Sequence, residues 1–249
     1  MIKYVRAVLL FPTFVFATAI IYVSWWIGSF FVPNKQYWRQ LAFKLWTLSF
    51  VRLSGMTIEV IGTPPNPPFF LVVNHVSYVD IALIRAAVPG VFVAKAEISD
   101  WLVAGRLVRD MGNIFIDRKN RRDIPRAGKK ILERLDEGEG VVIFPEGTST
   151  KGEDVLPFNS SFLEFAASSG LPISYASISY RTPPGEPTPS QRICWWDDTK
   201  FIPHMFRLFT LGRYTGVINF GNELVKGDDR KKLAAELRER VKKGFIPML

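Results

Sequence analysis

The sequence predicts an α/β fold, a mixed and mostly parallel sheet flanked by helices, preceded by an N-terminal two-helix membrane motif. Three observations predict it. A long apolar segment opens the chain, an amphipathic segment follows, and from Met56 onward short apolar runs alternate with turns and helical stretches. These features divide the chain into a membrane-associating helical hairpin at residues 1–55 and an α/β domain at residues 56–249.

Composition narrows both the class of protein and the class of partner. The 249 residues are 48% hydrophobic and 14% aromatic, enough apolar surface to offset the entropy of ordering, so a disordered chain is excluded. The single cysteine, Cys194, excludes an intrachain disulfide framework. A net charge of +9 indicates an anionic partner, and the mean hydropathy of +0.11 favours a membrane surface over nucleic acid.

The first predicted element is the apolar segment Ala7–Val32, in which no side chain except that of Tyr22 is ionisable. As a helix it reaches roughly 39 Å, more than the ~30 Å hydrocarbon core of a bilayer, so it can span a membrane. It is too long for the core of a signal peptide, and we expect it to be retained. Basic residues flank both ends, in excess after the helix. That excess favours a cytoplasmic position for the following domain and leaves open a hairpin that dips into one leaflet.

Pro33-Asn34 ends this helix, and Gln36–Leu53 forms the second one. Its polar and apolar residues recur at helical spacing on opposite sides. The polar side holds Gln36, Gln40, Lys44 and Thr47, and the apolar side holds Trp38, Leu41, Ala42, Leu45 and Leu48. This pattern is typical of an amphipathic helix at a membrane interface, and equally of a helix that packs its apolar face on the following domain.

The remaining elements follow from apolar runs bounded by turns. Strands are predicted at Thr57–Ile61, Phe69–Val73, Val91–Ala94, Asn113–Ile116, Val141–Phe144 and Ile173–Ser179. Two Pro-rich segments, residues 63–68 and 182–189, must be loops because proline cannot continue a helix or a central strand. A charged helix is predicted over Asp228–Lys243, with Leu233, Leu237 and Val241 on one side.

His75 is the leading candidate for a catalytic base. Only two histidines are present, and His75 directly follows the strand Phe69–Val73, at the strand end where α/β proteins place ligands. The pattern Ser77-x-x-Asp80 is also a capping box that opens a helix. The two interpretations are compatible. With Ser77 as the cap, the loop before it can fold the ring of His75 back toward Asp80, which then fixes the tautomer.

Two further segments carry candidate binding groups. Gly112–Arg118 is a short strand that ends in a charged pair, and Phe144–Thr148 again directly follows an apolar strand. Arg118 can hold a phosphate bidentately, while Glu146 and the Gly147-Thr148 amides offer an acceptor and donors at a turn. Taken singly, the first segment is equally typical of a surface ion pair and the second of an ordinary turn.

The order of these three segments resembles a known family. Asn-His-x-Ser-x-x-Asp, Gly-x-x-Phe-Ile-Asp-Arg and Phe-Pro-Glu-Gly-Thr are similar to the motifs of glycerolipid acyltransferases with a His-x4-Asp motif, specifically the 1-acyl-sn-glycerol-3-phosphate acyltransferases. The resemblance runs from Thr57 to about Ile178 and includes Leu171-Pro172-Ile173, where the family has a looser Pro-containing motif. Three motifs in this order and spacing are highly specific.

The resemblance implies the reaction and the roles of individual residues. It implies an O-acyltransferase of phospholipid biosynthesis that moves a fatty acyl group from acyl-CoA or acyl carrier protein to the free hydroxyl of 1-acylglycerol-3-phosphate, giving phosphatidic acid. No cofactor or metal is implied. His75 would be the general base and Asp80 would orient it. The implied substrate-binding residues are Arg118 and Lys95 for the acceptor phosphate, and Glu146, Gly147 and Thr148 for its glycerol part.

Two departures from the family pattern leave the acceptor open. Many members carry a polar or basic residue where Ser149 stands, and a basic residue at the position of Asn159. Without those charges the case for a strongly anionic acceptor is reduced, and a different lysolipid such as lyso-ornithine lipid is an alternative.

Other classes of protein account for fewer features. A non-catalytic membrane-interaction protein is an alternative, although His75, Asp80, Arg118 and Glu146 are all retained. Nucleic-acid binding is not expected, because the only dense basic cluster is residues 118–122.

His204 follows Asp197-Asp198, but no further His, Cys, Asp or Glu cluster supports a metal site there. We therefore expect His204 to serve in packing or in a contact with an acyl chain and the membrane. We expect a bacterial inner-membrane protein whose catalytic domain faces the cytoplasm and binds membrane lipids.

Overall fold

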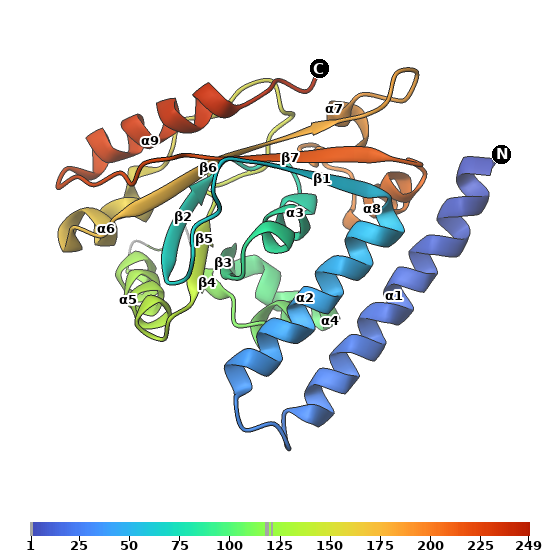
Figure 1. The fold of residues 1–249 in the computed structure, drawn as a ribbon, viewed down its shortest axis with the longest axis horizontal. Coiled ribbons are helices and arrows are strands. Elements are labelled where there is room, and N and C mark those ends of the chain that lie inside the picture. Colours follow the sequence, from blue (N-terminus) through green and yellow to red (C-terminus); the bar gives the residue numbers. More distant parts are fainter. Residues whose placement is uncertain (1, 118–119, 121) are drawn as a thin grey trace.

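The computed structural model describes residues 2–117, 120 and 122–249. Within these residues seven strands form one sheet in the order β1-β7-β6-β2-β5-β3-β4 (Figure 1). Neighbouring strands run parallel except β6 and β7, which are antiparallel. The strands are β1 (Met56–Ile61), β2 (Phe69–Val73), β3 (Val91–Lys95), β4 (Ile114–Ile116), β5 (Gly140–Ile143), β6 (Ile173–Arg181) and β7 (Tyr214–Phe220). The predicted fold class, a mixed and mostly parallel sheet, is confirmed.

Helices cover both faces of the sheet (Figure 1). One face packs on α1 (Ile2–Gly28), α2 (Lys35–Ser54), α3 (Val79–Ala87) and α8 (Phe201–Phe209). The other face packs on α5 (Asp123–Asp136), α6 (Glu164–Ser169) and α9 (Arg230–Gly244). The shorter elements are η1 (Ala96–Asp100), α4 (Leu102–Asp110), η2 (Ser160–Leu163) and α7 (Pro189–Arg192). The six predicted strands and the predicted C-terminal helix are present with small shifts of their ends, whereas β7 was not predicted.

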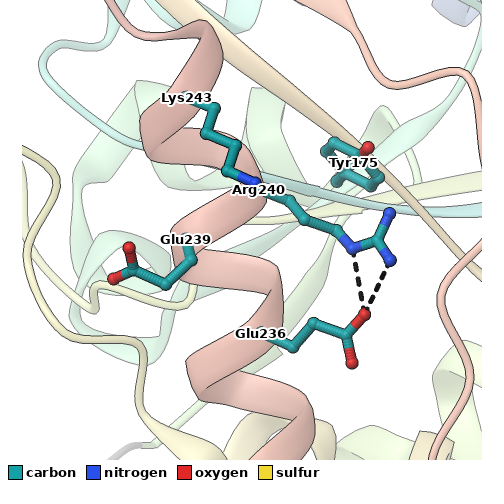
Figure 2. Close-up of a pocket in the computed structure, with 5 residues that line it drawn as sticks. All are labelled: Tyr175, Glu236, Glu239, Arg240 and Lys243. Atoms are coloured by element: carbon teal, nitrogen blue, oxygen red, sulfur yellow. Dashed lines mark hydrogen bonds and ion pairs between the residues drawn. The ribbon is translucent and has the colours of Figure 1, made fainter.

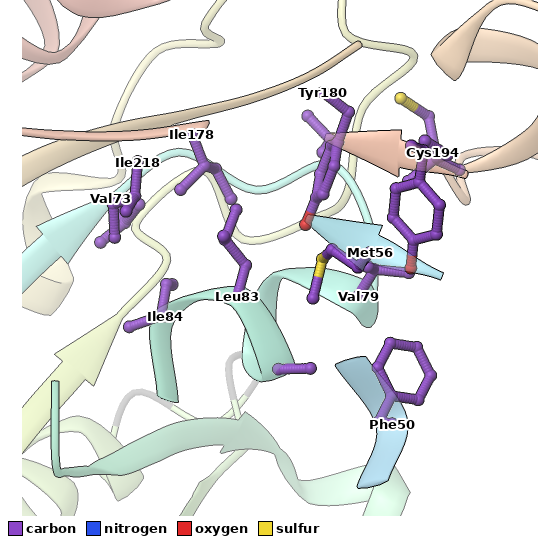
Figure 3. Packing of buried hydrophobic residues seen from close by; sticks show 14 of the residues in the cluster. Phe50, Met56, Val73, Val79, Leu83, Ile84, Ile178, Tyr180, Cys194 and Ile218 are labelled. Carbon is purple, nitrogen blue, oxygen red and sulfur yellow. The ribbon is translucent and has the colours of Figure 1, made fainter. Parts of the chain in front are cut away.

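Strand β2 lies in the middle of the sheet, and all five of its residues are buried. A parallel strand covered on both faces needs an unbroken apolar run, which Phe69–Val73 supplies. Figure 3 shows Leu83 and Ile84 of α3 in the cluster that also holds Val73, Ile178 and Ile218 from the strands. The strand is therefore fixed on both sides, and the loop that follows it starts from a rigid point.

The first two helices form an antiparallel pair at one side of the molecule (Figure 1). Helix α1 ends at Gly28 and not at Val32. The indole ring of Trp38 packs closely at this end, since a Cβ on Gly28 would lie 2.5 Å from that ring. By length and composition the segment Lys3–Gly28 is able to cross a membrane. Its mean hydropathy is 2.1, and only 11% of its most apolar part is buried.

The side of α2 that packs on the domain is only partly the predicted apolar side: it includes Ala42, but also Thr47, which was predicted on the polar side. Its buried residues are Ala42, Phe43, Thr47, Phe50 and Ser54, whereas Leu45 and Leu48 are about half exposed. The helix packs on the α/β domain, as one of the two sequence interpretations held, but through a face that includes polar residues. Gly55, with φ of +82°, ends it in a left-handed conformation that leads directly into β1.

A buried ionic cluster explains why a polar side of α2 faces inward. The carboxylate of Glu139, which is 3% exposed, accepts hydrogen bonds from Arg39, Gln40 and Arg134. Arg85 of α3 donates to the backbone and side-chain oxygens of Gln40. Burial lowers the pKa of Arg85 to about 10. These contacts fasten α2 to α3 and to the residues that precede β5.

Candidate active site

The candidate site lies at the carboxyl end of β2, where the chain leaves the sheet. Asn74, which the sequence analysis gave no role, is buried and binds β6 with both ends of its amide group. Its Nδ2 donates to the carbonyl of Ile178 at 3.0 Å, and its Oδ1 accepts from the amide of Ile178 at 2.8 Å. The first loop residue is therefore held as firmly as a strand residue.

His75 and Asp80 are in contact, as the sequence predicts. Nδ1 of His75 lies 2.7 Å from Oδ2 of Asp80. A carboxylate only accepts, so Nδ1 carries the proton and Nε2 of the neutral ring is the unprotonated nitrogen. The Asp80 side chain is fully buried, while the His75 side chain is 22% exposed. The pair thus joins a shielded carboxylate to a ring that solvent can reach.

Asp80 also organises the loop around the histidine. Its Oδ2 accepts from the amides of Val76 and Ser77 at 2.8 and 2.9 Å. Only half of the predicted capping box forms. The hydroxyl of Ser77 accepts from Val79 at 3.3 Å and not from the third helical residue, because α3 begins at Val79 with Tyr78 as its N-cap. The carboxylate therefore caps the loop and holds the ring at the same time.

Tyr180 completes the set of groups around Asp80, and sequence reasoning missed it. Tyr180 lies near the C-terminal end of β6, and its hydroxyl donates to Oδ1 of Asp80 at 2.8 Å. Burial and the nearby carboxylate raise the pKa of Tyr180 well above its usual value, so the group remains a donor. Tyr180 continues the alternating positions Ala176 and Ile178 of β6, which join the same core cluster; this spacing indicates its burial but not its partner.

The ring of His75 is held from a second side by β5. It stacks on Phe144, with ring centroids 4.1 Å apart and planes 18° from parallel. The backbone carbonyl of His75 accepts from the amide of Thr150 at 3.0 Å. Phe144 follows β5, the parallel neighbour of β2, so the carboxyl ends of two adjacent strands meet at the imidazole.

Glu146 holds the backbone of the histidine loop. Its Oε1 accepts from the amide of His75 at 2.6 Å, and its Oε2 accepts from the amide of Leu156 at 2.8 Å. Burial raises the pKa of Glu146 to about 7, against the lowering effect of those two hydrogen bonds. Both oxygens predicted to contact a substrate are thus already engaged with backbone donors.

The other predicted binding residues lie around this centre. Gly147 adopts φ of +77°, which the turn after Glu146 requires and which other residues rarely adopt. Thr148 is exposed on the same turn, and Lys95 is exposed at the end of β3, which β5 separates from β2. Arg118 lies outside the described residues.

His204 belongs to the packing behind the loop, and among the described residues it forms no ion pair with a carboxylate. Its Nε2 donates to the carbonyl of Cys194 at 3.0 Å, and its Nδ1 lies 3.1 Å from the hydroxyl of Tyr78. It is 4% exposed, and burial lowers its pKa. The packing role expected for His204 is the one observed.

A surface pocket lies between α9 and β6 (Figure 2). It is lined by Tyr175, Glu236, Glu239, Arg240 and Lys243. Arg240 is already paired with Glu236 at 2.8 Å, as Figure 2 shows. None of the predicted catalytic residues lines this pocket.

The arrangement at His75 is suited to base catalysis on a hydroxyl. An unprotonated Nε2 on a partly exposed ring can take a proton from a bound alcohol, and the buried carboxylate stabilises the imidazolium that results. No group of three or more His, Cys, Asp or Glu side chains able to hold a metal ion occurs in the part of the chain that the structure describes.

Comparison with known proteins gives consistent matches. The model of the acyltransferase family matches residues 57–179. A lyso-ornithine lipid O-acyltransferase of Pseudomonas aeruginosa is 30% identical over 82% of this chain and 78% of its own length. A 1-acyl-sn-glycerol-3-phosphate acyltransferase of Neisseria gonorrhoeae is 29% identical over 72% of this chain and 70% of its own length. The crystal structure of the lysophosphatidate acyltransferase PlsC of Thermotoga maritima, 23% identical, superposes with a TM-score of 0.70 over 97% of this chain and 95% of that one, and so shows the same fold.

Proposed function

This chain belongs to the acyltransferase family, and on that premise we propose that it transfers a fatty acyl group from acyl-CoA or acyl carrier protein to the free hydroxyl of 1-acylglycerol-3-phosphate. The product is phosphatidic acid, a precursor in phospholipid biosynthesis. The observation that carries the proposal is the contact between Nδ1 of His75 and the buried carboxylate of Asp80.

The proposed reaction is a direct transfer without an acyl-enzyme. Nε2 of His75 removes the proton from the acceptor hydroxyl as its oxygen attacks the thioester carbonyl carbon. The C–S bond then breaks, and the departing thiolate takes the proton from the imidazolium. Asp80 keeps the proton on Nδ1 throughout and balances the transient positive charge. Positioned base catalysis of this kind is worth roughly a hundred- to ten-thousand-fold in rate.

Around the base, we assign the acceptor to the turn after β5. Gly147 and Thr148 contact the glycerol part, and Arg118 with Lys95 binds the phosphate. Glu146 acts mainly through the backbone of His75, because its two oxygens accept from His75 and Leu156. Its carboxylate therefore positions the base as well as facing the acceptor.

A second candidate acceptor is lyso-ornithine lipid. Relatives with that name align over more of this chain than the relative from Neisseria gonorrhoeae does. Ser149 and Asn159, at the two positions where many family members carry polar or basic residues, have uncharged side chains. Ser149 donates to the carbonyl of Trp195, and Asn159 caps η2 by accepting from Ser161.

The proposed location is a bacterial inner membrane, with the α/β domain on the cytoplasmic side where acyl donors are made. The length and hydropathy of Lys3–Gly28 support the association with a membrane.

A parallel acceptor assay tests the proposal. Purified full-length protein is given a labelled acyl donor with lysophosphatidate, lyso-ornithine lipid or lysophosphatidylcholine, and labelled product is separated and counted. The proposal expects the highest kcat/KM with lysophosphatidate. A preference for lyso-ornithine lipid would select the second candidate, and failure with every acceptor would favour a non-catalytic protein.

A further inference from the structure

Four exposed apolar side chains, those of Trp101, Leu102, Val103 and Ile202, form a patch at the starts of α4 and α8. The ring of Phe201 connects the patch to the candidate site, because it contacts both Trp101 and Tyr78. The exposed fractions are 96% for Leu102, 71% for Val103, 57% for Ile202 and 39% for Trp101. Leu102 and Val103 begin α4, and Ile202 lies at the start of α8. Nearly complete exposure of two adjacent aliphatic side chains at a helix start is unfavourable in water. This patch, called the tip patch below, therefore fits a surface with an apolar partner.

The backbone holds the tip patch rigidly. Gly105 of α4 packs on the preceding 3-10 turn so closely that a Cβ there would lie 2.4 Å from the carbonyl oxygen of Ser99. The ring of Trp101 contacts that of Phe201, with centroids 5.6 Å apart. The exposed side chains are thus presented by a fixed turn.

The tip patch is connected to the exposed apolar side of α1. At the far end of α4, Asp110 accepts a hydrogen bond from Tyr22 of α1 at 2.6 Å. Leu102 lies eight residues earlier on the same helix, about 12 Å along its axis. Next to Tyr22, α1 exposes Val23, Trp26 and Ile27, each by about half. A lipid phase that covers this part of α1 therefore reaches the neighbourhood of the tip patch.

Helix α8 makes a second connection between the tip patch and α1. Phe206 of α8 contacts Phe11 of α1, with ring centroids 6.1 Å apart. Ile202 precedes Phe206 by one helical turn, so it extends the same apolar side. Both elements that carry the tip patch are thus braced against the helix that is long and apolar enough for a membrane.

We propose that the tip patch inserts into the same lipid leaflet as the exposed side of α1, as a second membrane contact made by the α/β domain itself. Exposed charges of both signs, Arg106 and Lys200 against Glu97 and Asp100, border it and would stay among the head groups. Trp101 has the amphipathic ring favoured at that depth. The inference rests on the membrane location given under the proposed function, and it is independent of the acceptor.

Insertion at this place brings the membrane surface to the catalytic loop. Phe201 contacts both Trp101 and Tyr78, the latter with ring centroids 4.9 Å apart. Tyr78 lies three residues after His75 in the loop that Asp80 organises. A lysolipid acceptor would then reach the base with its acyl chain still partly in the leaflet.

The depth of the tip patch can be measured directly. Val103→Cys is labelled with an environment-sensitive fluorophore, while Cys194 is buried and gives little background. Vesicles of phosphatidylethanolamine and phosphatidylglycerol should shift the emission to the blue, and spin-labelled lipid should quench it. The control is Leu224→Cys, also exposed (62%), in the connection between β7 and α9 at the other end of the sheet (Figure 1). Equal, unshifted emission from both positions would overturn the proposal and would favour a protein partner for the patch.

A binding measurement separates this inference from the proposed reaction. The double variant Leu102→Gln, Val103→Gln should partition into the same vesicles about ten- to a hundred-fold less than wild type, and Leu224→Gln should not differ from wild type. Turnover of a short-chain, water-soluble lysolipid should be unchanged in the double variant. A double variant that partitions into the vesicles as wild type does would contradict the second membrane contact. Absence of turnover in wild type and in every variant would instead contradict the proposed acyl transfer.

Discussion

Replacing Asp80 by asparagine separates the negative charge of this side chain from its role as an acceptor. Oδ2 of Asp80 accepts from Nδ1 of His75 and from two loop amides, and Oδ1 accepts from the hydroxyl of Tyr180. The side-chain oxygen of asparagine can take the place of Oδ2. Its NH2 group can donate to the hydroxyl oxygen of Tyr180, because a hydroxyl accepts as well as donates. The loop should therefore keep its conformation while the charge beside the imidazole is lost.

The size of the effect follows from the type of hydrogen bond. A bond to a charged group is worth roughly 1.5–3 kcal/mol, and the imidazolium formed during proton transfer needs that charge more than the neutral ring does. Since each 1.36 kcal/mol is tenfold, Asp80→Asn should lower kcat by roughly 10- to 150-fold. KM should change little, because the fully buried carboxylate is positioned to contact the base and not the substrate.

The assay is steady-state release of free thiol from the acyl donor, together with a thermal unfolding curve for each variant. The matched control is Asp229→Asn. That aspartate also accepts from two backbone amides, those of Lys231 and Lys232 at the start of α9, and asparagine caps a helix nearly as well. The control should keep wild-type kcat. An Asp80→Asn protein with more than half of the wild-type kcat would refute the role assigned to the carboxylate.

Three further outcomes are expected. Because burial raises the pKa of Glu146 from 4.5 to about 7, the folded protein keeps a proton in this pH range that the unfolded chain loses. The free energy of unfolding of wild type, measured relative to that of Glu146→Gln, should therefore fall by about 3 kcal/mol between pH 4.5 and 7 and stay level above pH 7. Glu139→Gln leaves Arg39, whose side chain is 13% exposed, without its charged partner and should lower that free energy by about 3 kcal/mol in urea unfolding. Tyr78→Phe removes the hydroxyl next to Nδ1 of His204 and should cost about 1 kcal/mol, with kcat lowered less than tenfold.

Each of these outcomes has a result that contradicts it. A pH-independent difference between wild type and Glu146→Gln would show that the carboxyl has an ordinary pKa in the folded state. Wild-type stability of Glu139→Gln would mean that the cluster around it is neutral in the folding balance. A hundred-fold loss of kcat in Tyr78→Phe would give this hydroxyl a part in the reaction that the described contacts do not predict.

Local signals were sufficient for most of the sheet and for the centre of the site. The strand β2 is a continuous apolar run, and the five-residue spacing of His75 and Asp80 needs only a loop at a strand end to bring them together. By contrast, Tyr180 reaches Asp80 only because β6 crosses beside β2, a contact between residues 100 positions apart. No local pattern specifies such a partner.

The errors on α2 and β7 have the same origin in long-range contacts. Phe43 and Phe50 of α2 pack into the core, and Glu139 binds Arg39 and Gln40 on the same helix, so Leu45 and Leu48 stay half exposed. Strand β7 includes a glycine and an asparagine, which interrupt its apolar pattern, and its place is decided by its pairing with β1 and β6. Tertiary context overrides local periodicity in both cases.

The central claim, direct acyl transfer to a lysolipid hydroxyl with His75 as base, is tested most directly by a mass balance on wild type and His75→Ala. Purified protein is incubated with labelled acyl donor and lysolipid, and free thiol, acylated lipid and protein-bound label are measured together. Direct transfer predicts equal amounts of thiol and acylated lipid, no label on the protein, and a loss of at least about a hundred-fold in His75→Ala. Label retained on the protein, or a His75→Ala variant with half of the wild-type rate, would contradict it.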